Sequence, residues 1–159
     1  MKNILKIISY QEIKKHLDFL KNKNIVLVGG CFDIFHYGHL KFLEKAKKQG
    51  DFLIVILESD DFIKKYKRQQ PIHNQQQRAE ILASLNFVDL IIKIPLFKSD
   101  KDYFELVKLI KPKIIAVTQG DKQLKNKEKQ AKEIGGEVKV VSPLLKKFST
   151  TKISKIFKL

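Results

Sequence analysis

Short apolar runs alternate along the chain with longer segments in which apolar residues recur at helical spacing. The apolar runs cover residues 25–28, 52–57, 88–92, 114–117 and 138–141. Runs this short and apolar on both faces are typical of parallel strands buried under helices. The periodic segments predict helices over residues 38–48, 78–85, 103–110 and 122–134. The alternation therefore predicts one α/β domain with a Rossmann-like, doubly wound parallel sheet of five strands.

The two ends of the chain are predicted to be helical. Residues 10–22 carry three apolar residues on one helical stripe, and we expect residues 1–23 to form a brace before the first strand. Residues 148–159 predict a C-terminal helix, so that a single domain spans residues 1–159. Residues 64–77 are polar and form the one long segment without a regular pattern. In a compact domain, a connection of that length is either mobile or functional.

Lysine supplies nearly all of the strong positive charge. The chain has 32 Lys plus Arg against 17 Asp plus Glu, a formal net charge of +15, and its arginines are Arg68 and Arg78. Surfaces dedicated to nucleic acids use arginine for bidentate contacts and concentrate their charge on one element, whereas these lysines are scattered. We therefore do not expect a nucleic-acid partner, although a positive field attracts anionic substrates such as nucleotides.

The cysteine count and the hydropathy pattern predict a cytoplasmic protein. The single cysteine, Cys31, excludes an internal disulfide framework and fits a reducing compartment. No uninterrupted apolar run approaches the roughly 20 residues that a membrane helix needs, and the N-terminus has no signal-peptide pattern. We accordingly expect no membrane partner.

The candidate chemistry lies directly after the first strand, in residues 29–39. Ligands of doubly wound sheets bind outside the carboxyl ends of the strands, and this is the first such end. The segment matches neither the dinucleotide fingerprint nor the phosphate-binding P-loop, so hydride transfer and P-loop hydrolysis lose their usual support. It instead combines two glycines with His36 and His39 at a predicted helix start. That spacing places both imidazoles on one side of the first turn, beside backbone N–H groups that favour phosphate.

The pattern His36-x-Gly38-His39 after Phe32-Asp33 resembles the signature of the cytidylyltransferase-like nucleotidyltransferase superfamily. Within it the chain most resembles the heptose 1-phosphate adenylyltransferase module, and next the glycerol 3-phosphate cytidylyltransferases. The resemblance covers nearly the whole chain and is carried further by Lys6-Ile7-Ile8-Ser9, Gly50-Asp51, Ser59-Asp60, Arg78-Ala79-Glu80, Val88-Asp89, Lys111-Pro112, Gly120-Asp121 and Ser149-Thr150-Thr151.

The resemblance implies a nucleotidyl transfer. A phosphate oxygen of the acceptor would attack the α-phosphorus of a nucleoside triphosphate and release pyrophosphate. Transfer of AMP to a phosphorylated sugar such as heptose 1-phosphate is the first expectation, and transfer of CMP to glycerol 3-phosphate is the alternative. Magnesium is expected on the triphosphate through phosphate oxygens and water rather than in a carboxylate cage. Homodimerisation is a further expectation from the family.

The same resemblance assigns roles to individual residues. His36 and His39 would contact the triphosphate and stabilise the transition state, while Lys67 or Arg68 in the polar segment would clamp phosphates. Ser149 would begin a helix whose N-terminus meets the triphosphate, an assignment that its N-cap pattern supports independently. The residues expected to bind the nucleotide are Gly29, Gly30, Cys31, Phe32, Asp33, Gly38, Arg78, Gly120, Asp121, Ser149, Thr150 and Thr151.

Several candidates also have a purely structural interpretation. The two histidines could serve only as caps, but the strand, glycines and aspartate around them favour the functional role. Asp33 either closes the turn or orients a neighbouring imidazole. Cys31 is expected to be a buried filler rather than a nucleophile. His73, in the polar segment, could reach a ligand if that segment closes.

The sequence departs from the heptose-type pattern at four positions. Gly29 and Glu58 stand where that pattern has asparagine, which leaves the choice of base or acceptor open. Gln119 replaces a glycine and could narrow the base pocket. Leu144 replaces an arginine, for which Lys146 and Lys147 could substitute. Gln119 and Leu144 motivate a hypothesis of another class, a nucleotide-binding sensor that has lost turnover.

Overall fold

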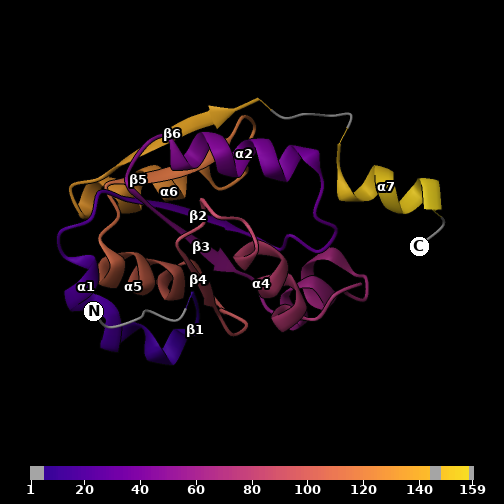
Figure 1. The fold of residues 1–159 in the computed structure, drawn as a ribbon, viewed down its shortest axis with the longest axis horizontal. Coiled ribbons are helices and arrows are strands. Elements are labelled where there is room, and N and C mark those ends of the chain that lie inside the picture. The colour runs from indigo at the N-terminus through magenta and orange to yellow at the C-terminus, as the bar shows by residue number, and fades with distance from the viewer. Residues whose placement is uncertain (1–5, 144–147, 158–159) are drawn as a thin grey trace.

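The computed structural model describes residues 6–143 and 148–157, which form a sheet covered by helices on both faces (Figure 1). The six parallel strands are β1 (Ile7–Ser9), β2 (Ile25–Gly30), β3 (Phe52–Leu57), β4 (Leu90–Lys93), β5 (Ile114–Thr118) and β6 (Glu137–Ser142). The α-helices are α1 (Leu17–Leu20), α2 (Tyr37–Lys47), α3 (Asp60–Phe62), α4 (Gln75–Ala83), α5 (Asp100–Ile110), α6 (Leu124–Glu133) and α7 (Thr150–Phe157). A 3₁₀-helix, η1 (Tyr10–His16), and a π-helical turn, η2 (Ile63–Lys67), complete the elements.

The expected parallel α/β architecture is confirmed, but the expected count of five strands is wrong. The sixth strand is β1, which pairs with β4 in the register Ile7↔Ile91 and Ile8↔Ile92. It has three residues at the edge of the sheet, and only Ile8 is buried. A strand of that length gives no alternation to detect, which is why the sequence pattern did not reveal it.

Successive residues of the four inner strands, β2 to β5, contribute to two separate cores. On β2, Ile25 and Leu27 pack with the layer of α5 and α6, whereas Val26 and Val28 pack with the layer of α2 and α4. β3 is buried along its whole length, so it has no polar face. This burial on both faces explains the continuous apolar runs in the sequence.

The strand order β1-β4-β3-β2-β5-β6 places the point of reversal next to β2. The chain proceeds from β2 to β3 and β4 on one side, and β5 and β6 lie on the other. Ligand sites of doubly wound sheets lie at such a reversal, outside the carboxyl ends of the strands. The turn after Gly30 and the turn after Thr118 both open at this place.

Helix boundaries differ from the expected ones where capping decides them. α4 begins at Gln75 because Asn74 and Gln77 form a capping box, and α5 begins at Asp100 because Ser99 and Asp102 do the same. The polar segment is also more regular than expected, since η2 extends to Lys67 and leaves residues 68–74 irregular. In the described ranges, no helix is long and apolar enough to cross a membrane.

Candidate active site

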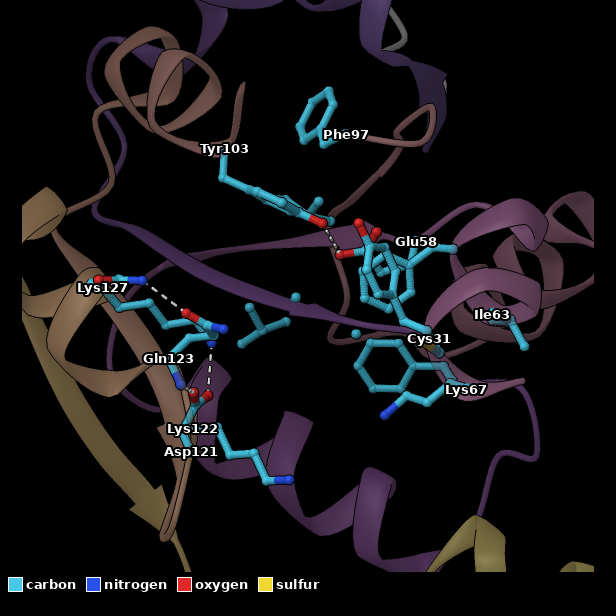
Figure 2. Close-up of a pocket in the computed structure, with 18 of the residues that line it drawn as sticks. Cys31, Glu58, Ile63, Lys67, Phe97, Tyr103, Asp121, Lys122, Gln123 and Lys127 are labelled. Atoms are coloured by element: carbon cyan, nitrogen blue, oxygen red, sulfur yellow. Dashed lines mark hydrogen bonds and ion pairs between the residues drawn. The ribbon is translucent and has the colours of Figure 1, made fainter. Parts of the chain in front are cut away.

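A cleft of about 930 Å³ opens at the carboxyl ends of β2, β3 and β5 (Figure 2). A smaller cavity of about 300 Å³ adjoins it and reaches α2 and the start of α7. The residues that line both are Gly29, Gly30, Cys31, Phe32, His39, Asp121, Lys127 and Thr150. The turn after β2, in which the sequence predicted the chemistry, therefore lines both hollows.

His36 is the N-cap of α2, and this role fixes the state of its ring. Its Nδ1 accepts hydrogen bonds from the backbone N–H of Gly38 at 3.1 Å and of His39 at 3.4 Å. An Nδ1 that accepts cannot also carry a proton, so the neutral ring holds its proton on Nε2. Burial lowers the pKa of His36 in addition. The ring thus acts as a cap and still has an N–H to donate to a ligand.

His39 stacks on His36, as the spacing of three residues predicted. The ring centroids lie 3.8 Å apart at 20°. Phe32 closes the other side of His39 with an edge contact at 5.0 Å. Burial, followed by the neighbouring His36, lowers the pKa of His39 to about 3. Its Nδ1 is buried and has no hydrogen-bond partner within the described ranges. In the absence of a ligand, this ring is neutral at physiological pH.

Gly38 allows the two rings and the C-terminal segment to approach one another. A Cβ at this position would lie 3.0 Å from Cε1 of His36 and 3.3 Å from the carbonyl oxygen of Phe148. Both contacts are tighter than ordinary van der Waals packing. Any side chain at this position would push the ring of His36 away from the helix or displace the segment before α7.

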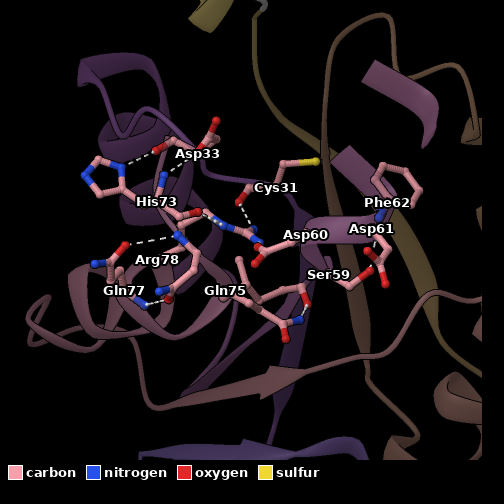
Figure 3. Close-up of polar contacts among 12 residues, drawn as sticks. Cys31, Asp33, Ser59, Asp60, Asp61, Phe62, His73, Gln75, Gln77 and Arg78 are labelled. Carbon is pink, nitrogen blue, oxygen red and sulfur yellow. Dashed lines mark hydrogen bonds and ion pairs between the residues drawn. The ribbon is translucent and has the colours of Figure 1, made fainter. Parts of the chain in front are cut away.

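The turn between β2 and α2 is held by a buried polar cluster (Figure 3). The carboxylate of Asp33 accepts hydrogen bonds from the backbone N–H groups of Ile72 and His73, at 3.0 Å each. His73 Nδ1 in turn donates to the carbonyl oxygen of Asp33 at 3.0 Å. Asp33 therefore fastens the irregular segment to the turn. His73 contacts this turn and does not line either cavity.

Arg78 is placed behind the cleft rather than in it. Its side chain is fully buried and donates to the carbonyl oxygens of Cys31 at 2.6 Å and His73 at 3.0 Å, and to Asp60 Oδ1 at 2.7 Å. All three guanidinium nitrogens are thus occupied by groups of the protein. Arg78 therefore holds the turn after β2 and, with no exposed surface, presents no donor to the cleft.

The turn itself contains one unusual backbone conformation. Phe32 has φ of 49°, in the left-handed region, and its ring is buried against His39. Burial raises the pKa of the Cys31 thiol to about 11, so this cysteine stays protonated and is no nucleophile. Gly29 and Gly30 line both cavities, and a Cβ on Gly30 would lie 2.8 Å from the Phe32 ring. The pair of glycines leaves the backbone open to a ligand.

The other sequence-predicted residues divide between the cleft and the surface. Lys67 lines the cleft, whereas Arg68, exposed and with φ of 54°, does not. Asp121 lines it and forms an ion pair with Lys127 at 2.7 Å. Gly120 precedes it with φ of 79°, in the turn after β5. Gln119 is exposed and absent from both linings, which gives no support to a narrowed base pocket.

The C-terminal helix begins as the sequence predicted. Ser149 Oγ accepts a hydrogen bond from the Lys152 N–H at 3.2 Å and caps α7. Ser149 lines the smaller cavity, Thr150 lines both cavities and Thr151 lines the cleft. The positive end of α7 therefore faces the hollow that also contains His39. Leu144, Lys146 and Lys147 lie outside the described residues.

Sequence reasoning missed a hydrogen-bonded pair on the far wall of the cleft, formed by the buried Glu58 and the partly buried Tyr103. Tyr103, on α5, donates its hydroxyl hydrogen to Glu58 Oε1 at 2.8 Å, and the two side chains face one another in Figure 2. Burial raises the pKa of Glu58 to about 7. The sequence marked Glu58 as a departure from the heptose-type pattern, but nothing in it indicated the partner. Lys122 and Gln123, which also line the cleft, carried no motif that could have identified them.

The raised pKa of Glu58 predicts a pH-dependent gain in stability for Glu58→Gln. Folding disfavours the charged carboxylate, so the wild-type free energy of unfolding falls as pH rises from about 4.5 to about 7. Glutamine cannot ionise. We expect the variant to exceed the wild type by about 3 kcal/mol at pH 8 and to match it near pH 4.5, in urea denaturation at both pH values. A difference that does not change with pH would contradict the assigned burial.

The fold and the cleft together define a class of protein. A doubly wound sheet that presents paired imidazoles, lysine and a helix N-terminus at its strand ends has the features of a nucleotide-binding enzyme. Residues 27–155 match the family model described as cytidylyltransferase-like. The chain belongs to this nucleotidyltransferase family, and the resemblance carried by the histidine motif is confirmed.

Two groups of relatives stand out among the similar proteins. Bifunctional protein HldE of Aliarcobacter butzleri is 42% identical over 151 residues, which cover 93% of this chain and 30% of that protein. The FAD synthase of Pyrococcus abyssi is 38% identical over 135 residues, which cover 84% of this chain and 89% of that protein. The chain thus spans less than a third of the HldE relatives, and most of the FAD synthase.

Solved structures share the architecture. The lipopolysaccharide core biosynthesis protein from Thermoplasma volcanium matches with a TM-score of 0.62 at 28% identity, over 76% of this chain and 96% of that one. The pantoate-beta-alanine ligase from Francisella tularensis, complexed with Beta-gamma ATP and beta-alanine, matches with a TM-score of 0.66 at 19% identity, over 98% and 79% of the two chains. The second likeness concerns the fold alone.

Proposed function

We propose that the protein transfers AMP from ATP to a phosphorylated sugar, with heptose 1-phosphate as the first candidate, and releases pyrophosphate. The observation that carries the proposal is the stacked pair of His36 and His39, centroids 3.8 Å apart, at the end of β2 and against the start of α7. Relatives named HldE at 42–44% identity support the heptose-type acceptor.

The residues of the chain would act by position and charge. An acceptor phosphate oxygen forms a bond to the α-phosphorus while the bond from that phosphorus to pyrophosphate breaks, so the protein need not form a covalent intermediate. The Nε2–H of His36, the ring of His39 and the N–H groups of α7 would donate to oxygens on which negative charge builds. Lys67 would hold the departing pyrophosphate or the acceptor phosphate.

Magnesium would enter with the triphosphate. Among the described residues there is no group of three or more His, Cys, Asp or Glu side chains that could hold a metal ion. The site therefore suits an ion carried by phosphate oxygens and water, which is how Mg²⁺ commonly meets nucleotides. When bound, the ion would neutralise part of the phosphate charge.

The relatives named FAD synthase favour a second candidate acceptor, the flavin mononucleotide that adenylylation would convert to FAD. Glycerol 3-phosphate with CTP is a third, from the sequence resemblance. We expect pyrophosphate release to be fastest with ATP and heptose 1-phosphate when each acceptor is tested with each triphosphate and Mg²⁺. If pyrophosphate release is fastest with another triphosphate and acceptor, those two compounds replace ATP and heptose 1-phosphate as the proposed substrates. Tight nucleotide binding without product would instead support a sensor that has lost turnover.

Two further proposals concern the location of the protein in the cell and its oligomeric state. We place the protein in the cytoplasm, where its nucleoside triphosphate is available, and fractionation of cells that express the tagged chain tests this. Homodimerisation stays a prediction from the family, and sedimentation velocity tests it.

A further inference from the structure

The larger cleft has a wall that the smaller cavity lacks. Glu58, at the end of β3, and Tyr103, on α5, line the 930 Å³ cleft, whereas His36 and Ser149 line the 300 Å³ cavity. If the triphosphate lies against the histidines and α7, the acceptor approaches from the side of Glu58 and Tyr103. This wall is therefore the candidate surface for acceptor recognition.

Glu58 has a hydrogen-bonding position to spare. The residue is 8% exposed, and its Oε1 already accepts the hydroxyl hydrogen of Tyr103 at 2.8 Å. Its Oε2 is buried and finds no partner anywhere in the part of the chain that the structure describes. Leaving a buried carboxylate oxygen unpaired costs about 1–3 kcal/mol or more. A ligand that donates to Oε2 would recover that cost on binding.

The pair is held rigidly from behind. The Tyr103 ring makes an edge contact with Phe97 at 4.9 Å, and Phe97 makes another with Tyr10 at 5.2 Å. These contacts fix the tyrosine hydroxyl, and through it the orientation of the Glu58 carboxylate. The other carboxylate oxygen is thereby kept in one place, as a recognition site requires.

The charge of the cleft indicates which group of a ligand could donate to Oε2 of Glu58. Lys67, Lys122 and Lys127 line the same cleft, and they favour an anionic acceptor and disfavour an ammonium group. The Glu58 carboxylate repels the acceptor phosphate, whereas the lysines attract it. The site therefore distinguishes the phosphate end of the acceptor from its hydroxyl end. The Gln69 amide adds a donor and an acceptor for further hydroxyl groups, and Asn126 adds an acceptor, since its Nδ2 already donates to Asp100 and Gln123.

We infer that Glu58 is a specificity-determining residue whose Oε2 accepts a hydrogen bond from a hydroxyl group of the phosphorylated acceptor, with Tyr103 as its positioning residue. This inference rests on the proposed function, since it concerns the acceptor half of the same site. It makes the acceptor a polyhydroxylated phosphate rather than a simple anion. The stability gained by Glu58→Gln at pH 8 separates any loss of recognition from unfolding.

The first test measures acceptor binding without turnover. Heptose 1-phosphate and its monodeoxy analogues are titrated by calorimetry into the protein saturated with a non-hydrolysable ATP analogue. We expect Glu58→Gln to weaken heptose 1-phosphate binding by about 10- to 100-fold, the effect of a hydrogen bond to a charged group. One deoxy analogue should bind the wild type as weakly as heptose 1-phosphate binds Glu58→Gln. The variant should bind that analogue and heptose 1-phosphate with equal affinity. The affinity for the ATP analogue should not change.

A matched control uses another glutamate. Glu105, also on α5, is exposed, pairs with Lys108 and lines neither cavity, so Glu105→Gln should leave acceptor affinity unchanged. Equal affinity in wild type and Glu58→Gln, or no binding of heptose 1-phosphate by the wild type, would overturn the inference. Binding that depends on Glu58 without pyrophosphate release from any pair would overturn the proposed function alone.

The role of Tyr103 is tested by the pH profile of binding. Glu58 is faced by Tyr103 from α5, Arg78 from α4, Lys127 from α6, Lys67 from η2 and the Cys31 thiol, and the bond from Tyr103 lowers the pKa of Glu58. In the wild type, acceptor affinity should fall below about pH 7 as Glu58 takes up a proton. Tyr103→Phe should move that midpoint to higher pH, and Glu58→Gln should remove it. An unmoved midpoint in Tyr103→Phe would reject the positioning role.

Discussion

Replacing His39 with alanine should lower turnover by about 10²-fold or more while the protein stays folded, because the proposed reaction would lose one preorganised donor to the phosphates. The ring lies between His36 and Phe32 and lines both cavities, so the alanine leaves a hole where charge would develop. Pyrophosphate release under saturating ATP and acceptor measures the effect. His16→Ala provides the control, since His16 lines neither cavity.

His36 permits a sharper version of the experiment, because its two roles can be separated. Alanine removes both the N-cap and the Nε2–H, whereas asparagine is itself a strong N-cap. We expect Ala to lose about 1 kcal/mol of stability and Asn to lose little, while both lose about 10²-fold or more in turnover. Activity within a few-fold of wild type in either alanine variant would remove that histidine from the mechanism.

Replacing Arg78 should produce the largest loss of stability among the substitutions considered. Its buried guanidinium donates to Asp60 and to the carbonyl oxygens of Cys31 and His73. Arg78→Met would leave these acceptors without donors and Asp60 without its counter-charge. We expect the free energy of unfolding in urea to fall by about 3 kcal/mol or more, because two carbonyl oxygens inside the protein lose their donors, at about 1–3 kcal/mol each, and the partly exposed Asp60 loses its counter-charge.

Two arginine-to-lysine changes separate the hydrogen-bonding geometry of the Arg78 guanidinium from its charge. Arg78→Lys keeps the charge but cannot reach three acceptors with one ammonium group, so it should still lose about 2 kcal/mol. Arg68→Lys, at an exposed position, should stay within about 0.5 kcal/mol of wild type. A loss below about 1 kcal/mol in Arg78→Met would mean that the cluster of Figure 3 contributes little to folding.

The sequence was informative about the fold wherever an element is long enough to carry a period. β3 has six consecutive buried residues and was predicted with its observed bounds. β1, with three residues and one of them buried, was missed. The starts of α4 and α5 were placed late, because Asn74 and Ser99 are polar cap residues that an apolar period does not include.

The site was predictable where its chemistry is local in sequence. His36 and His39 are three residues apart, so a helical turn alone brings their rings together. The pair of Glu58 and Tyr103 joins residues 45 apart, and the contact of Arg78 with Cys31 joins residues 47 apart. Such contacts depend on how strands and helices pack. Arg78 was accordingly expected at the phosphates, although tertiary packing directs its guanidinium into the protein.

Glu58 is also a warning for protein engineering. A screen of random variants for heat resistance at neutral pH would select its replacement early, because an uncharged side chain at that position removes a penalty of folding. The selected proteins would withstand heating and fold well, yet on the inferred role of Glu58 they would bind the acceptor more weakly and no longer distinguish it from its deoxy analogues. Libraries of variants made to raise the thermal stability of this protein should therefore keep the codon for Glu58 unchanged.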